Sequence, residues 1–117
     1  MRRVFVLLIA LAVACGADGV LTASEAVDAF VAAGLDAPNP RDVSDTECPD
    51  TCVEAVATDV VTVQRWSDTQ AAYVHSQGVE QPAYALETFV ILFPVGTEVE
   101  TNAYADVLAD AVQEARS

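Results

Sequence analysis

The sequence predicts an α+β fold: a small, mostly antiparallel sheet of about three strands with helices packed on it, in the order α-β-β-α-β-α. Three observations support this class. Apolar residues recur at helical spacing in three segments, β-branched residues dominate three others, and turn-forming residues separate the two kinds. With 117 residues in all, the chain is long enough for one domain with a modest core.

The first helix is expected to begin at Thr22. Thr22 and Glu25 have the spacing of a capping box, in which each side chain accepts a hydrogen bond from the other residue's backbone N–H. Gly34 is suited to ending the helix, and Leu35 can then pack back on it. The apolar residues at helical spacing are Val27, Phe30 and Val31. The polar segment 36–48, which contains two prolines, is predicted to be a loop.

Two strands are expected between Cys52 and Trp66, joined by a turn at Thr58-Asp59. Alternation in the second strand places Val61 and Val63 on one face. The opposite face carries Thr62 and Gln64 and is expected to be in contact with water.

The second helix is predicted to begin with a capping box, Ser67-Asp68-Thr69-Gln70, and to end at Gly78. Ala71 and Val74 should face inward, with Tyr73 at the border. A single strand is predicted for residues 84–93. Residues 88–93 are apolar at both alternating sets of positions, which is typical of a strand buried on both sides. The last helix begins near residues 98–102, and its apolar stripe consists of Tyr104, Val107, Leu108, Ala111, Val112 and Ala115.

The N-terminus has the layout of an export signal. Arg2 and Arg3 precede eleven apolar residues, Val4 to Ala14. A transmembrane helix needs roughly 20 apolar residues, so this run is too short to remain as a stable membrane span. The segment 1–14 is therefore predicted to be a signal peptide.

The residues at the end of this run resemble the lipobox of bacterial lipoproteins: Ala12-Val13-Ala14-Cys15, followed by Gly16. Ala12 stands where the usual motif has leucine. The resemblance implies that Cys15 becomes the new N-terminus and carries a lipid on its sulfur, anchoring the protein to the cell membrane. Residues 15–21 then form a lipidated tether and residues 22–117 a single domain. The alternative is an ordinary signal peptide, with Cys15 incidental and the protein secreted.

Two cysteines remain beyond Cys15, namely Cys48 and Cys52. Outside the cytoplasm such a pair most often forms a disulfide, and Pro49-Asp50 supplies the turn that brings the two residues together. A redox role is disfavoured because the spacing is Cys-x3-Cys. A zinc site is disfavoured because His75 is the only histidine in the sequence.

The charge balance excludes most anionic partners. The chain has 18 acidic and five basic residues and a formal net charge of −13. Only three of those basic residues lie beyond the apolar run, and none is lysine. Such a surface repels nucleic acid and anionic headgroups, so no nucleic-acid binding is expected. The lipid on Cys15 is then the expected attachment to the membrane.

No catalytic constellation is evident. Asp42, Asp45, Glu47 and Asp50 could attract calcium but lack the spacing of a calcium loop. His75 has no nucleophile in a recognised motif beside it, so an envelope hydrolase is the least favoured alternative. No cofactor or metal is expected.

The stretch Cys52-Val53-Glu54-Ala55-Val56-Ala57-Thr58-Asp59-Val60-Val61-Thr62-Val63, with Cys48 before it and a capped helix after it, resembles small lipoproteins and secreted proteins of actinobacteria. The resemblance covers residues 22–93 and implies no activity. The sequence therefore predicts a lipid-anchored envelope domain that binds or supports an envelope protein, with a small-ligand or calcium carrier as the alternative.

Overall fold

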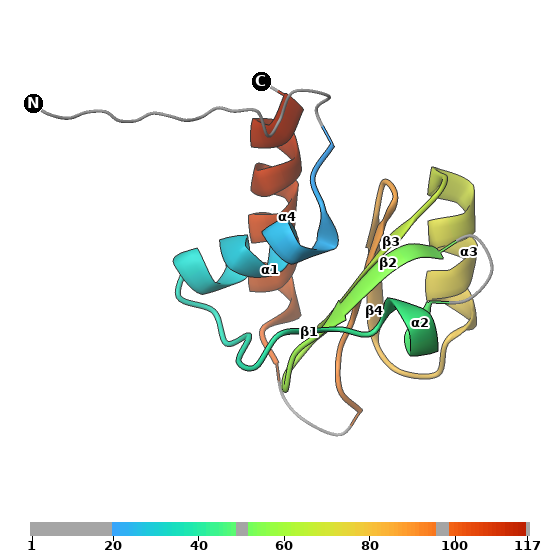
Figure 1. The fold of residues 1–117 in the computed structure, drawn as a ribbon, viewed down its shortest axis with the longest axis horizontal. Helices are drawn as coiled ribbons and strands as arrows, with labels where there is room; N and C mark the ends of the chain where they lie inside the picture. The colour runs from blue at the N-terminus through green and yellow to red at the C-terminus, as the bar shows by residue number, and fades with distance from the viewer. Residues whose placement is uncertain (1–19, 49–51, 96–98, 117) are drawn as a thin grey trace, which may run out of the picture.

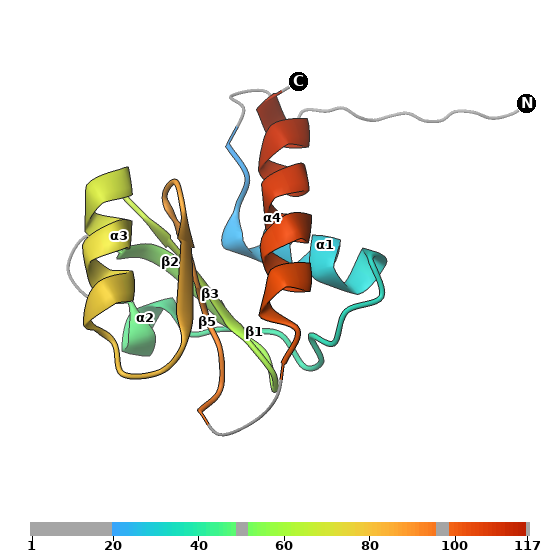
Figure 2. The ribbon, with the colours of Figure 1, turned by 180° about the vertical axis from the view of Figure 1, so that it is seen from behind.

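The computed structural model describes residues 20–48, 52–95 and 99–116. They form an α+β domain in which a five-stranded antiparallel sheet has helices on both faces (Figures 1 and 2). The strand order across the sheet is β1-β2-β3-β5-β4. The predicted class is confirmed, but the sheet has five strands instead of the predicted three or so.

Helix α1 (Ala23–Ala32) begins and ends as predicted. Thr22 Oγ1 accepts from the Glu25 N–H at 3.0 Å, and Glu25 Oε1 accepts from the Thr22 N–H at 2.9 Å. Gly34 has a φ of 85°, a conformation that glycine adopts without strain. The Leu35 N–H donates to the Phe30 carbonyl, and Leu35 packs against the core. Of the three apolar residues at helical spacing, Val27 and Phe30 are buried, whereas the side chain of Val31 is 55 % exposed.

The segment predicted as a loop, 36–48, contains two short elements. Strand β1 (Arg41–Asp42) pairs with β2 at the edge of the sheet, and α2 (Ser44–Glu47) is a single helical turn. Neither element shows hydrophobic periodicity, because both are short and mainly solvent-facing. Pairing with β2 defines β1, and this pairing is not visible in local sequence.

The predicted hairpin is present as β2 (Cys52–Ala57) and β3 (Thr62–Trp66). The Thr58 side chain holds the turn: its Oγ1 accepts from the N–H groups of Val60 and Val61 and donates to the Val61 carbonyl. Val61 and Val63 are buried as expected. On the other face Thr62 is half-buried, so only part of this face is in contact with water. Gln64, which was expected to meet water, and Trp66 are 3 % and 5 % exposed beneath α3.

Helix α3 (Thr69–Gly78) is capped one residue later than predicted. Asp68, not Ser67, accepts from the backbone N–H of Ala71. Ala72 and Ser76 face the sheet, whereas Val74 is 59 % exposed, so its predicted inward position is wrong.

The single strand predicted for residues 84–93 is a hairpin of β4 (Ala83–Leu86) and β5 (Phe89–Leu92). The turn is at Glu87, whose φ is 54°. Glycine or asparagine usually occupies such a position, so the sequence carries no turn signal there. The prediction that residues 88–93 are buried on both sides agrees with β5, which lies between β3 and β4.

Helix α4 (Thr101–Arg116) packs with α1 on one face of the sheet. Tyr104, Leu108 and Val112 of the predicted stripe are buried. The Tyr104 ring makes edge contacts with Phe30 and Phe93 at centroid distances of 5.0 and 5.9 Å. This main core and the smaller one under α3 make three layers, with the sheet in the middle (Figure 2).

Candidate functional site

The predicted lipidation site, Cys15, lies outside the described residues, as does the rest of the predicted signal peptide. The described chain begins at Val20, and the next residue, Leu21, already packs against the main core. The start of the described chain (blue) and the C-terminal end of α4 (red) lie at the same end of the molecule (Figure 1). No helix within the described residues is long and apolar enough to span a bilayer.

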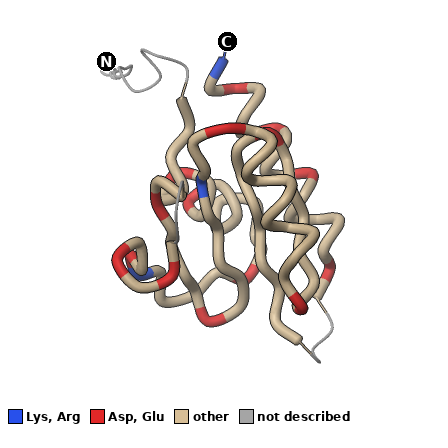
Figure 3. Tube along the Cα trace, turned by 90° about the vertical axis from the view of Figure 1, so that its right-hand side faces the viewer, with Lys and Arg blue, Asp and Glu red and all other residues tan. Residues whose placement is uncertain are grey.

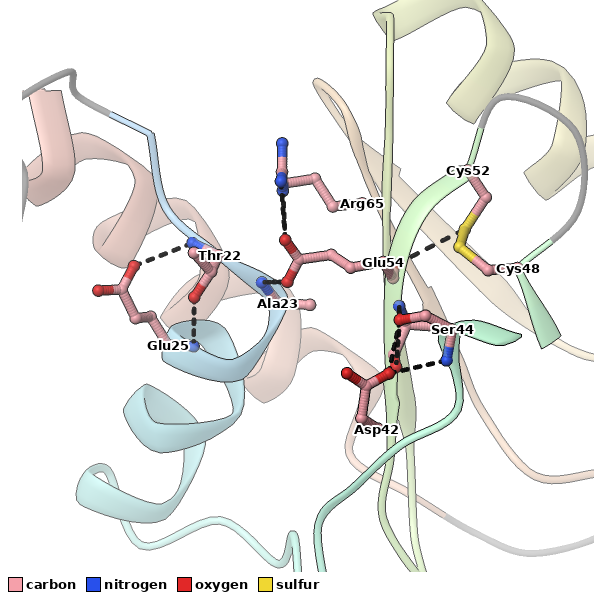
Figure 4. A network of polar contacts seen from close by, with 10 residues as sticks. Thr22, Ala23, Glu25, Asp42, Ser44, Cys48, Cys52, Glu54 and Arg65 are labelled. Carbon is pink, nitrogen blue, oxygen red and sulfur yellow. Dashed lines mark hydrogen bonds and ion pairs between the residues drawn. A yellow bond between two sulfur atoms is a disulfide. The ribbon is translucent and has the colours of Figure 1, made fainter. Parts of the chain in front are cut away.

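The predicted disulfide is present in the structure, where Cys48 and Cys52 are bonded and their Cα atoms are 5.1 Å apart. It fastens the end of α2 to the start of β2 (Figure 4). Closing so short a loop lowers the entropy of the unfolded chain and so stabilises the folded state by about 2 kcal/mol. The bond therefore adds a covalent link to the hydrogen bonds that hold the α2 turn on the sheet.

A second set of contacts attaches α2 to β2. Ser44 Oγ accepts from the Ala55 N–H at 3.0 Å and donates to Asp42 Oδ1 at 2.6 Å (Figure 4). The Ser44 hydroxyl and backbone N–H both donate to Asp42 and lower the pKa of its carboxyl group. Asp42 is thus already used within the chain, which weakens its candidacy as a calcium ligand.

The remaining carboxylates of the candidate calcium loop do not converge. Asp45 and Glu47 are exposed on α2, and Asp50 lies outside the described residues. Among the described residues, no group of three or more His, Cys, Asp or Glu side chains is placed to hold a metal ion. Calcium needs six to eight oxygen ligands around one point, and this part of the chain does not gather them.

Glu54 connects three elements. Its Oε2 accepts from Arg65 Nε and Nη2 at 3.0 and 2.7 Å, and its Oε1 accepts from the Ala23 N–H at 2.8 Å (Figure 4). The contact with the Ala23 N–H joins the sheet to the first turn of α1. Both charged side chains are about one-fifth exposed, so water screens this pair less than a fully exposed one. The arrangement is structural, because its donors and acceptors are occupied by one another.

His75 lies on α3 with its ring against Trp66, at a centroid distance of 4.6 Å. Burial lowers the pKa of this imidazole. The Trp66 indole N–H donates to Gln64 Oε1, and Gln64 Nε2 donates to the Glu47 carbonyl. A shallow hollow of about 430 Å³ between α2 and α3 is lined by these polar groups. Catalysis by His75 gains no support, since the one cysteine lining the hollow, Cys48, is in the disulfide.

The lowered pKa of His75 predicts a pH dependence of stability. The unfolded chain binds a proton at His75 near pH 6.5, whereas the folded chain does so only at lower pH. The unfolded state is therefore favoured as the pH falls through 6.5. Between pH 7.5 and 5.5, the urea midpoint of the wild-type protein should fall more than that of His75→Gln. Equal changes in the two proteins would contradict this origin of the pH dependence.

A larger cavity, which we call the distal cavity, is lined in part by the β2–β3 turn and the start of α4. These two segments lie at the end of the molecule opposite the C-terminus (Figure 1). It has a volume of about 490 Å³ and is lined by four segments: the residues after α1, the β2–β3 turn, the residue after Phe93 and the start of α4. Apolar side chains line it at Leu35, Val60, Pro94 and Val99, and Tyr104 closes it. Carboxylates lie at its edge: Asp36, Asp59 and Glu100.

The three carboxylates around the distal cavity differ in whether a positive charge of the same chain lies beside them. The Tyr104 hydroxyl donates to the Asp36 carbonyl at 2.6 Å, and burial, together with the Asp36 charge, raises the pKa of this tyrosine. Asp59 accepts from Asn39, which lowers its pKa, and it also pairs with Arg41. Within the described residues, the Asp36 and Glu100 carboxylates have no ion pair. The edge therefore keeps a net negative charge.

The surface as a whole is acidic, and acidic positions recur along the chain in Figure 3. Each described arginine is already paired: Arg41 with Asp59, Arg65 with Glu54 and Arg116 with Glu87. Most described carboxylates thus have no cationic partner within this part of the chain. The fold and surface define a three-layer α+β domain with an acidic exterior. The chain matches no protein-family model, no curated protein and no solved structure.

Proposed function

We propose that this protein is a bacterial lipoprotein: an envelope domain anchored to the outer face of the cell membrane through lipid on Cys15, which binds a protein partner there. The observation that carries the proposal is the N-terminal sequence, where Arg2-Arg3 and eleven apolar residues end at Ala12-Val13-Ala14-Cys15-Gly16. Two or more acyl chains would give a stable anchor without any basic patch on the protein.

The start of the domain supports a short tether. Only residues 16–20 separate Cys15 from Leu21, which packs on the core. Five residues span less than about 20 Å even when fully extended. The end of the molecule that carries Val20 would therefore face the membrane, and the distal cavity would face away from it. A partner-binding role fits this orientation, because the exposed end is the one that carries a cavity.

The proposal predicts that Cys15→Ala releases the protein from the membrane fraction or leaves the unprocessed precursor. The experiment compares the variant with the wild type in a bacterial host by membrane fractionation, Triton X-114 partitioning and mass spectrometry of the N-terminus. The wild type should carry a mass increase on Cys15 and partition into detergent. Globomycin, which blocks the lipoprotein signal peptidase, should make the wild-type precursor accumulate.

The matched control is the double variant Cys48→Ser/Cys52→Ser. It removes the other two cysteines and should leave processing and membrane attachment unchanged. If Cys15→Ala is processed and retained on the membrane like the wild type, the lipoprotein proposal is wrong. If the mature wild-type protein carries no lipid and enters the medium, the protein is secreted without an anchor and the lipoprotein proposal is wrong.

A further inference from the structure

The distal cavity combines two chemical characters. Its interior is apolar, with half-buried side chains at Leu35, Val60, Pro94 and Val99. Its edge is acidic, and the Asp36 and Glu100 carboxylates are exposed and have no ion pair within the described residues. Its volume of about 490 Å³ is in the range of cavities that hold small ligands or large side chains.

The charge around the cavity selects the sign of its ligand. The first turn of α4 contributes a partial positive charge of about one half, and Arg41 offsets Asp59. Two carboxylates remain against this half charge, so the edge is negative overall. An anionic ligand would be repelled, and a cation with an apolar body would satisfy both the edge and the interior.

A second copy of the chain is a poor candidate for the occupant. Each of the three described arginines already pairs with a carboxylate of its own chain, and the sequence has no lysine. A bare metal ion also fits poorly, because most of the lining is apolar and the described residues gather no set of three metal ligands. The occupant is therefore expected to be a different, basic molecule.

We propose that the distal cavity binds a basic segment of another envelope protein, with a lysine or arginine side chain paired to Asp36 and Glu100 and a neighbouring apolar side chain against Leu35, Val60 and Val99. This inference rests on the proposed function, because a domain anchored through Cys15 would have its distal cavity facing away from the membrane, where such partners can reach it. The cavity is formed by three loops and the start of α4, and these are held together by the Tyr104 hydroxyl on Asp36 and the ring contacts of Tyr104 with Phe30 and Phe93.

The test measures binding of a fluorescein-labelled peptide that contains two arginines flanking a phenylalanine. The protein is the full mature chain, purified in a non-ionic detergent, and detergent alone serves as the blank. A peptide with both arginines replaced by glutamate should bind at least tenfold more weakly. Raising the salt from 150 to 500 mM should weaken binding of the basic peptide, because the pairs at the edge are exposed.

Near-isosteric variants locate the site. Asp36→Asn and Glu100→Gln should each weaken binding about two- to fivefold, the range of exposed ion pairs, and Val99→Ser should weaken it without altering the salt dependence. The matched control is Asp110→Asn, which removes the same charge from the exposed surface of α4, more than two helical turns from Glu100. Its affinity should stay within about 1.5-fold of the wild type. Circular dichroism melting of each variant checks that the fold is kept.

Several results would overturn the proposal. Equal weakening by Asp110→Asn would mean that the peptide senses only the overall charge. If the glutamate peptide bound as tightly as the arginine peptide, the cavity would not select its ligand by charge. Competition by free arginine amide at the same concentration as the peptide would assign the cavity to a small cation instead of a protein segment. Because binding in detergent solution does not depend on lipid at Cys15, these outcomes are separate from those of the fractionation experiment.

Discussion

Truncation of Phe30 to alanine is expected to lower the free energy of unfolding by about 3–5 kcal/mol. Phe30 is fully buried on α1, where its ring meets the edge of Tyr104 on α4. The substitution removes a large apolar side chain and leaves a cavity between the two helices that cover one face of the sheet. Chemical denaturation of the mature protein measures the change. A small domain has only about 5–15 kcal/mol of stability, so the variant should melt at a much lower temperature.

The neighbouring residue provides the control for this prediction. Val31 belongs to the same apolar run, but its side chain is 55 % exposed. Val31→Ala should change the free energy of unfolding by less than about 0.5 kcal/mol, as is usual for surface positions. Similar effects of the two substitutions would contradict the orientation of α1 in which Phe30 faces the core and Val31 faces solvent.

Replacement of Thr58 by valine is expected to cost about 1–3 kcal/mol, although the two side chains have nearly the same shape. The Thr58 hydroxyl accepts from the Val60 and Val61 N–H groups at 3.1 and 2.9 Å and donates to the Val61 carbonyl at 2.7 Å. Valine makes none of these bonds, and the Val61 N–H, on a residue that is 1 % exposed, then has no acceptor. Urea denaturation of the variant measures the loss.

The other hairpin offers a matched substitution. Thr88 follows Glu87 in the β4–β5 turn, and its hydroxyl makes no hydrogen bond with the described residues. Thr88→Val should therefore be nearly neutral. A similar loss in both variants would show that valine is poorly tolerated in turns generally and that the hydroxyl of Thr58 is not the cause.

The two turns also explain where the sequence-based prediction of the fold failed. Thr58-Asp59 is a recognisable turn between two valine-rich segments, and the hairpin was predicted with its buried valines. At Glu87, the chain reverses with a φ of 54° at a residue that rarely adopts this conformation. Pairing of β4 with β5 keeps that turn in place, so a contact beyond the local sequence overrides the local preference. Because Glu87 is not a usual turn residue, the sequence of residues 84–93 predicts one continuous strand.

The burial errors share one physical cause. Hydrophobic spacing indicates that a helix or strand has an apolar face, but not which other element will cover its second face. Gln64 was expected to meet water, yet α3 covers it, and the Glu47 carbonyl and the Trp66 indole satisfy its amide. On α3 the sheet covers the face that carries Ala72 and Ser76, and Val74 lies outside it.

The sequence alone determined the features that depend on local chemistry. These are the Thr22 capping box, the end of α1 at Gly34, the apolar stripe of the last helix, the pairing of Cys48 with Cys52, and the expectation that Cys15 carries a lipid, which remains a proposal. Each depends on residues close together in the chain. Tertiary structure decided the rest, because the distal cavity and the Glu54 contacts bring together segments far apart in sequence. The net negative charge of the chain follows from its composition, but only folding places Asp36 and Glu100 around one apolar hollow.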